Sequence, residues 1–260
     1  EIAINAPVDV TVDDDGRAYI ISDGAIIGVT GDSQPTTVVG GDQLMNPYRL
    51  SWAREHNELL VAEREESHRV KRFSLPGGQL LEEYGQAGGR PYGPYDPLSF
   101  RDINDVAPDG HGGFLIVEGG INAMQRTARF DSNGKLVDQW FGPQIFFNHA
   151  MPDPRNPERV FINGGRHAKT ELNVDYDTGE WDVVADYHHP RFGDGLFPNT
   201  AGAHHQWHVR HRDGKTYLIC DNASRFGIVR LDREQSKLVP VAVSGSVRNP
   251  KRRELPAPLA

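Results

Sequence analysis

A repeated order of short strands constrains this chain more than any other feature of its sequence. Five segments share one pattern: a short strand, a polar turn with Gly, Asp or Asn, a strongly β-forming strand, and two further strands separated by a turn. Their expected strands span residues 8–13, 18–21, 26–29 and 37–39; 48–52, 59–62, 70–73 and 80–84; 103–107, 114–117, 127–130 and 136–140; 147–151, 160–162, 172–176 and 181–184; and 206–209, 216–219, 228–231 and 239–243.

Four strands per segment, with segments starting about every 40–58 residues, are typical of β-propeller blades. We therefore expect an all-β propeller of four-stranded antiparallel blades over residues 1–246, with a Pro-rich basic tail or linker at 247–260. Five visible segments predict a five- or six-bladed ring, and the chain could be a fragment of a longer one. A large β-sandwich is the alternative.

Composition supports this class and excludes several others. The 28 Gly and 18 Pro residues argue against a helical bundle or a doubly wound α/β domain, because helix interiors exclude both residues. A net charge of −8 argues against a broad nucleic-acid-binding surface, and no apolar run is long enough to span a membrane. With Cys220 as the single cysteine, no internal disulfide can form. A start without Met favours a secreted or periplasmic protein, with the cytoplasm as the alternative.

Polar residues on the first strand of each segment are the candidate functional residues. In a propeller this strand lines the central channel, so its polar side chains should converge there. The candidates are Asp9, Arg49, Asn104, Asp105, Asn148, His149 and, in a histidine-rich segment, His204, His205, Gln206, His208 and His211.

The histidine-rich segment, AHHQWHVRH at residues 203–211, is the sharpest local signal. Strand alternation places Gln206 and His208 on one face, and His205 with Trp207 on the other. Imidazole is the commonest ligand of transition metals, and His149 and Asp105 could complete such a set. A divalent ion such as Zn, Mn, Fe or Ca is therefore one interpretation, and a hydrogen-bonded cluster between blades is the other.

This repeated order of strands and turns resembles the NHL-repeat family, and residues 7–13 and 16–20 look like one such repeat. This resemblance covers nearly the whole chain and implies the propeller fold. The resemblance indicates little about activity, because propellers include enzymes of many kinds as well as proteins that only bind a partner.

The C-terminal half resembles oligogalacturonate-lyase-type propellers at residues 148–154, 160–165, 204–207 and 213–215. That resemblance implies a metal held by His149, Gln206 and His208, with His205 as the substitute if the register shifts. It also implies β-elimination on a uronate, in which the cation neutralises the sugar carboxylate and a base removes the C5 proton. The remaining roles that we assign on this basis are carboxylate binding by Arg49 or Arg166, proton abstraction by His167, and substrate contact by Trp207.

Residues 100–110, FRDINDVAPDG, resemble the inner strand of gluconolactonase and regucalcin propellers. The resemblance implies that Asn104, Asp105 and Asn148 hold a calcium or zinc ion that polarises a lactone. Residues 206–208 depart from that pattern, because the family would place an Asp there.

Two loop segments have both a functional and an ordinary interpretation. Tyr92 and Tyr95 could form a sugar-stacking platform beside the pocket, or they could belong to a plain connection between blades. The charge run at residues 63–66 predicts a solvated hairpin tip. The sequence thus leaves three hypotheses open: a metal-assisted enzyme acting on uronate glycans, a lactonase-like hydrolase, and a non-catalytic propeller that binds a glycan, a small molecule or a protein.

Overall fold

The computed structural model describes residues 3–31, 33–119, 125–142, 150–165, 168–188, 206–222 and 225–245. Within these ranges the side chains of 163–165, 168, 206, 207, 220–222, 225, 226 and 243–245 are not described. The chain divides into two compact units. Unit 1 contains residues 1–91 and 96–142, and unit 2 contains residues 92–95 and 143–260.

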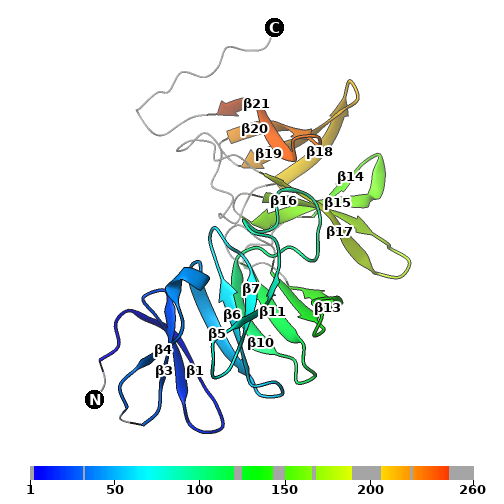
Figure 1. The fold of residues 1–260 in the computed structure, drawn as a ribbon. Helices are drawn as coiled ribbons and strands as arrows, with labels where there is room; N and C mark the ends of the chain where they lie inside the picture. Colours follow the sequence, from blue (N-terminus) through cyan, green and yellow to red (C-terminus); the bar gives the residue numbers. More distant parts are fainter. Residues whose placement is uncertain are drawn as a thin grey trace. The chain divides into compact units, whose positions relative to one another are not determined.

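The described chain is built almost entirely of strands, as the sequence predicts (Figure 1). Its helical content is one short 3₁₀ turn, η1, at Gly41–Gln43. The strands follow each other as antiparallel meanders of four, which is the blade architecture of a β-propeller. The predicted all-β propeller class is thereby confirmed.

Unit 1 contains three such sheets, each paired in chain order. The first comprises β1 (Pro7–Val12), β2 (Ala18–Ser22), β3 (Ala25–Val29) and β4 (Thr36–Val39). The second comprises β5 (Pro47–Ala53), β6 (Glu58–Glu63), β7 (Val70–Ser74) and β8 (Leu80–Tyr84). The third comprises β10 (Ile103–Pro108), β11 (Phe114–Glu118), β12 (Arg126–Phe130) and β13 (Leu136–Phe141).

Aspartates fix the hairpin turns of unit 1. The Oδ1 atom of Asp131 accepts hydrogen bonds from the amides of Asn133 and Lys135, both at 2.9 Å. Asp13 and Asp109 make the same pair of bonds to the amides two and four residues further on. An Asp side chain that bonds the following backbone favours a tight turn over a continuing strand. These turns therefore set the strand ends that the sequence predicts.

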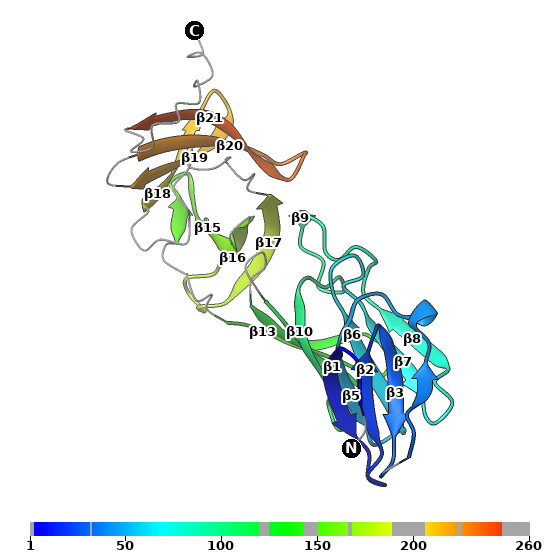
Figure 2. The ribbon, with the colours of Figure 1, turned by 90° about the vertical axis from the view of Figure 1, so that its left-hand side faces the viewer.

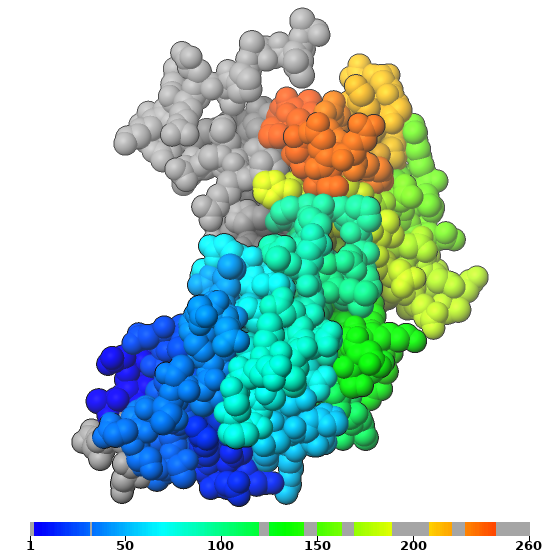
Figure 3. Space-filling model, in the orientation of Figure 1, coloured from blue at the N-terminus to red at the C-terminus, as the bar shows by residue number. Residues whose placement is uncertain are grey.

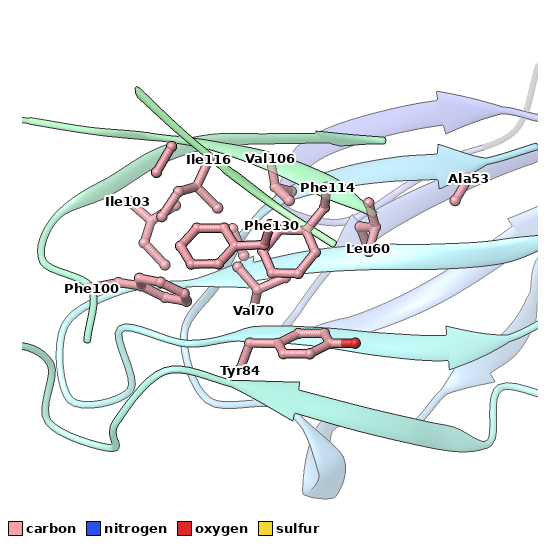
Figure 4. Packing of buried hydrophobic residues seen from close by; sticks show 12 residues of the cluster. Ala53, Leu60, Val70, Tyr84, Phe100, Ile103, Val106, Phe114, Ile116 and Phe130 are labelled. Atoms are coloured by element: carbon pink, nitrogen blue, oxygen red, sulfur yellow. The ribbon is translucent and has the colours of Figure 1, made fainter. Parts of the chain in front are cut away.

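Apolar side chains fill the space between neighbouring sheets of unit 1. Between the first and second sheets lie Tyr19, Ile21, Ile26, Val39, Leu50, Leu59, Val61 and Phe73. Between the second and third sheets, the rings of Phe114 and Phe130 stack with centroids 5.1 Å apart, and Tyr84 packs against Phe114 (Figure 4). Side chains of the first sheet lie directly against the second on the face drawn in Figure 3. The second sheet is therefore packed on both faces, which explains the continuous apolar run at residues 59–62 of β6.

Polar contacts also join the first strands of the first two sheets. The backbone amide of Leu50 on β5 donates to Asp9 Oδ2 at 2.8 Å, and the amide of Trp52 donates to Thr11 Oγ1 at 3.2 Å. Asp9 and Thr11 therefore hold β1 beside β5 by satisfying strand amides that would otherwise lack partners.

The last residue of the second strand holds the incoming connection in all three sheets of unit 1. Glu63 ends β6 and accepts from the Met45 amide at 2.8 Å, while its partner Lys71, 3.0 Å away, donates to the Gln43 carbonyl. The charge run at 63–66 was expected to be solvated, and for Glu63 this is wrong. Its side chain is 0% exposed, because Lys71 and Ser67 compensate its charge.

Glu118 repeats the arrangement at the end of β11. It accepts from the Arg101 amide at 2.5 Å and pairs with Arg126 at 2.6 Å, and Arg126 donates to the Pro97 carbonyl at 2.6 Å. In the first sheet Ser22 takes the same place, donating its hydroxyl to the Asn5 carbonyl at 2.5 Å. We call these three arrangements the connector locks.

Unit 2 contains two further four-stranded meanders. The first comprises β14 (Met151–Asp153), β15 (Asn156–Gly165), β16 (Ala168–Val174) and β17 (Trp181–His188). The second comprises β18 (Gln206–Arg212), β19 (Lys215–Asn222), β20 (Arg225–Asp232) and β21 (Lys237–Gly245), which lie side by side in Figure 2. Their shared core contains Met151, Phe161, Ala185, Tyr187, Val209, Leu218, Val229, Leu231 and Leu238.

Unit 2 departs from the prediction in three details. Between the strands expected at 147–151 and 160–162, the sequence predicts a turn through Asn156 and Pro157, but both residues belong to β15. The chain turns earlier, because Asp153 Oδ1 accepts from the Arg155 amide. The expected inner strand at 147–151 overlaps the described β14 only at Met151, and 147–149 lie outside the described residues. The two meanders also share one sheet, since His188 on β17 pairs with Lys237 on β21.

Candidate functional site

Two arginines and a tyrosine form a distinctive polar cluster near the start of β5 in unit 1. The Arg49 guanidinium carbon lies 4.0 Å from the centroid of the Tyr48 ring, and that of Arg64 lies 3.6 Å from the same centroid. Both guanidinium groups therefore contact the same aromatic ring. We call Tyr48, Arg49 and Arg64 the arginine–tyrosine cluster.

The backbone positions each member of this cluster. Tyr48 and Arg49 lie near the start of β5, and Arg64 directly follows the end of β6. Arg49 donates to the Tyr48 carbonyl at 3.0 Å and to the Tyr48 hydroxyl at 3.1 Å. These bonds fold the Arg49 side chain back over the ring, where the negative face of the aromatic π-system attracts the cation.

Arg64 is fixed from the neighbouring sheet. Its Nε donates to the Ile103 carbonyl at 2.5 Å, and a terminal nitrogen donates to the side-chain oxygen of Asn104. The amide nitrogen of Asn104 donates in turn to the Gly119 carbonyl. Asn104, one of the polar inner-strand candidates, therefore lies beside the arginine–tyrosine cluster and holds Arg64 in place.

The cluster carries two positive charges that no described carboxylate neutralises. Among the described side chains, no Asp or Glu oxygen lies within 4.0 Å of a guanidinium nitrogen of Arg49 or Arg64. Glu66, in the following loop, bonds Asn46 at 2.5 Å instead. Both arginines are half-buried and keep N–H groups available, so an anion on this surface would meet two preorganised donors.

The predicted metal ligands are only partly within the described residues. His149 lies outside them, and the side chain of Gln206 is not described. Asp105 belongs to unit 1, is exposed, and accepts a hydrogen bond from the amide of its neighbour Val106 at 2.9 Å. His208 belongs to unit 2 and is exposed on β18. Across the ranges that the structure covers, no three His, Cys, Asp or Glu side chains are grouped to hold a metal ion.

The other predicted site residues divide between described and undescribed parts. His205, Arg166 and His167 lie outside the described residues, and so does the side chain of Trp207. Tyr92 packs against His188 with ring centroids 4.9 Å apart and planes at 59°. The Tyr95 amide donates to the Val184 carbonyl at 3.0 Å.

Tyr92 and Tyr95 flank a strand that the sequence reading missed. Gly93 and Pro94 form β9, which pairs with Ala185 and Asp186 of β17. The connection is therefore more than a plain loop, because part of it forms a strand that pairs with β17. Their role in binding a sugar stays a prediction.

A contact between a partly buried imidazole and a buried carboxylate was not predicted from the sequence. His211 Nε2 lies 2.6 Å from Asp153 Oδ1, and His211 Nδ1 lies 3.3 Å from the Thr216 hydroxyl. Burial alone would raise the pKa of Asp153, but hydrogen bonds from the Arg155 amide and from His211 outweigh it and lower that pKa. The pair joins β14 to β18. In the described structure, His211 of the histidine-rich segment therefore links two strands.

Comparison with known proteins gives distant structural likenesses. No family model matches the chain, and no curated protein sequence matches it. A protein of unknown function from Desulfotomaculum acetoxidans is 13% identical with a TM-score of 0.38, over 93% of this chain and 71% of that one. A Lactobacillus plantarum protein is 12% identical with a TM-score of 0.40, over 94% and 73%. The Cps50 (Swd1) β-propeller domain of Myceliophteria thermophila is 12% identical with a TM-score of 0.38, over 94% and 73%.

These likenesses say nothing about activity, and the fold assignment rests on the sheet topology. The resemblances to NHL-repeat, lyase and lactonase propellers accordingly stay predictions. In the described part of the chain, no helix has the length and apolar character needed to cross a membrane.

Proposed function

We propose that this protein is a propeller-type binding module that captures a carboxylate-bearing ligand, such as a uronate glycan, at the arginine–tyrosine cluster. The proposal rests on one observation: the guanidinium groups of Arg49 and Arg64 both lie against the Tyr48 ring, and neither has a described carboxylate partner. Two like charges held this close repel each other, and a bound anion would relieve that repulsion.

The chemistry of the cluster favours a carboxylate over a neutral sugar. A guanidinium presents its N–H donors in a planar fork that matches both oxygens of a carboxylate. Tyr48 and Asn104 hold the two forks, so little side-chain entropy is lost when a ligand binds. The protein has a net charge of −8, so this positive cluster stands apart from an acidic whole.

Binding of trigalacturonate, measured by isothermal titration calorimetry, tests the proposal. Arg49→Gln and Arg64→Gln should each weaken binding by about tenfold or more, because each removes a charge-assisted hydrogen bond. Arg54→Gln is the matched control: it makes the same charge change on the turn after β5, where Arg54 is 73% exposed and pairs with Asp14. We expect that variant to bind like the original protein.

Two outcomes would contradict the proposal. If a neutral trisaccharide binds as tightly as trigalacturonate, the protein does not recognise the carboxylate. If Arg49→Gln and Arg54→Gln bind trigalacturonate with equal affinity, the arginine–tyrosine cluster is not the binding site. Arg64 also bonds the Ile103 carbonyl, so the Arg49 variant, which leaves that bond intact, guards against a loss of folding.

A metal-assisted β-elimination on uronates is our second proposal. What favours it is that β18 begins at Gln206, in the inner-strand position, and presents an exposed His208. The protein should then bind a divalent metal by elemental analysis and raise the ultraviolet absorbance of a galacturonate oligomer through the unsaturated product. If His208→Ala abolishes metal binding and Asp105→Ala does not, the lyase-like set is favoured, and the reverse result favours the lactonase-like alternative.

A further inference from the structure

Unit 2 contains a cavity of about 290 Å³ where β9, β17 and the turn between β20 and β21 meet. Its lining combines charged and apolar groups, among them Pro94, Arg159, Glu171, Val184, Tyr187 and Arg233. This volume is at the lower end of small-molecule sites, so any ligand would be small.

A buried carboxylate at this cavity is shared by two arginines. Glu171 Oε1 lies 2.7 Å from Arg159 Nε, and Glu171 Oε2 lies 2.7 Å from Arg233 Nη1. A second bond, from Arg233 Nη2 to Oε1 at 3.2 Å, makes the Arg233 contact bidentate. The Glu171 side chain is 2% exposed, whereas each arginine is 40% exposed and reaches solvent.

The tyrosine in this cluster adds no negative charge. The Tyr187 hydroxyl donates to Glu171 Oε2 at 2.6 Å and accepts from Arg233 Nη1 at 2.8 Å. Burial, followed by the hydrogen bond to Glu171, raises the pKa of Tyr187 above its usual range. Among the residues that line the cavity, two guanidinium groups against one carboxylate leave one net positive charge.

Arg159 keeps its fork available for a further anion. Among the described residues, Arg159 bonds protein only through Nε, so its two terminal Nη groups have no protein partner. Another part of the lining is apolar: it includes Pro94 on β9 and Val184 on β17, which is 40% exposed. A single surplus charge beside an apolar wall suits a monoanion with a short hydrocarbon chain better than a dianion.

We propose that this cavity is a second ligand site, in which Arg159 binds the carboxylate of a small aliphatic monoanion and Pro94 with Val184 contact its carbon chain. The site is separate from the arginine–tyrosine cluster and uses none of its residues. It is also independent of any metal, because every group that it needs is a described side chain.

Calorimetric titration of the full chain with butyrate, butyramide and inorganic phosphate tests this site. Butyrate should bind, butyramide should bind at least about tenfold more weakly, and phosphate should not exceed butyrate. Arg159→Gln should weaken butyrate binding by about tenfold or more. It should leave the fold intact, because Arg233 still pairs with Glu171 in both bonds.

The matched control is Arg212→Gln, which removes an arginine that is 84% exposed and pairs with Asp213 on the surface. A second variant, Val184→Glu, places a carboxylate on the exposed cavity wall and should abolish butyrate binding through charge repulsion. The proposal is overturned if butyrate does not bind, if butyramide or phosphate binds as well as butyrate, or if Arg159→Gln behaves like Arg212→Gln.

Discussion

At the scale of single residues, Asp153 shows how a local charge can tie two strands together. Its Oδ1 atom accepts from the Arg155 amide and contacts His211 Nε2, so one oxygen fixes both the turn after β14 and the link to β18. The carboxylate is almost fully buried, and its lowered pKa means that the ionised form is favoured in the folded state.

Asp153→Asn should therefore reduce the free energy of unfolding by about 1–3 kcal/mol at pH 7, as expected for a hydrogen bond to a buried charge. A carboxyl whose pKa is lowered by folding contributes stability above its unfolded pKa, roughly 4, and loses it as pH falls through the folded value. The difference between variant and original should hence shrink in acid. Urea unfolding at pH 7 and below pH 4 measures it.

Asp213→Asn is the control for this measurement, because Asp213 pairs with Arg212 at the surface and both side chains are more than 80% exposed. We expect that variant to change stability little at either pH. A difference for Asp153→Asn that grows in acid would contradict the assigned role of the carboxylate.

Sequence reasoning found some of these residues and missed others for a physical reason. Arg49 and Asn104 were found because strand position alone places them on an inner strand. Glu63 and Arg64 were read as part of a solvated charge run, since nothing local shows that Lys71 and Ile103 come from elsewhere to meet them. One sequence pattern could have indicated this buried ion pair: a carboxylate at the end of the second strand with a cation eight residues later. Glu63 with Lys71 follows this pattern, and Glu118 with Arg126 repeats it.

At the scale of elements, the hairpin between β7 and β8 shows how closely neighbouring sheets approach. Gly78 has a φ of +64°, and a Cβ atom built there would lie 1.8 Å from the Val38 carbonyl oxygen, in the β4 backbone of the first sheet. Only glycine accommodates both the left-handed backbone and this contact.

Gly78→Ala should consequently destabilise unit 1 by more than the roughly 1 kcal/mol that a left-handed backbone costs alanine. Gly16→Ala isolates the backbone contribution, because Gly16 has a φ of +77° and nothing within 4 Å of its added Cβ. We expect thermal unfolding to show a clearly larger loss for Gly78→Ala. Equal losses would show that the hairpin can move away from β4 without cost.

The strands themselves were largely predictable, and their pairing was not. Turn residues and short apolar runs mark strand ends locally, which is why 18–21 and 59–62 fall within β2 and β6. The two-residue strand β9 has no such pattern, because it forms only where the β17 edge is available. The link between His188 and Lys237 likewise depends on distant parts of the chain meeting.

At the scale of the whole molecule, the two units have separate apolar cores. Leu60 belongs to a core of unit 1 and Leu218 to the core of unit 2, and both are buried. Truncation of a buried leucine typically costs about 2–5 kcal/mol, through lost contacts and the cavity left behind.

Leu60→Ala and Leu218→Ala should therefore weaken different parts of the chain. Hydrogen exchange measured by mass spectrometry should show faster exchange in β5–β8 for the first variant and in β18–β21 for the second. In the double variant the two effects should add, as expected for residues that belong to different cores and share no packing partners. If either substitution accelerates exchange equally in both units, the cores are coupled and the prediction is wrong.

The connector locks bear on how such a chain could have arisen by duplication. Glu63 and Glu118 each hold a segment that enters their sheet from the preceding one, through the amides of Met45 and Arg101. A gene segment copied from the first strand to the fourth would leave its buried carboxylate without that amide. The unit that can be duplicated as a whole therefore includes the connection before its first strand and begins near Gln43 or Pro97. Experiments that exchange blades between proteins should place their junctions at these positions.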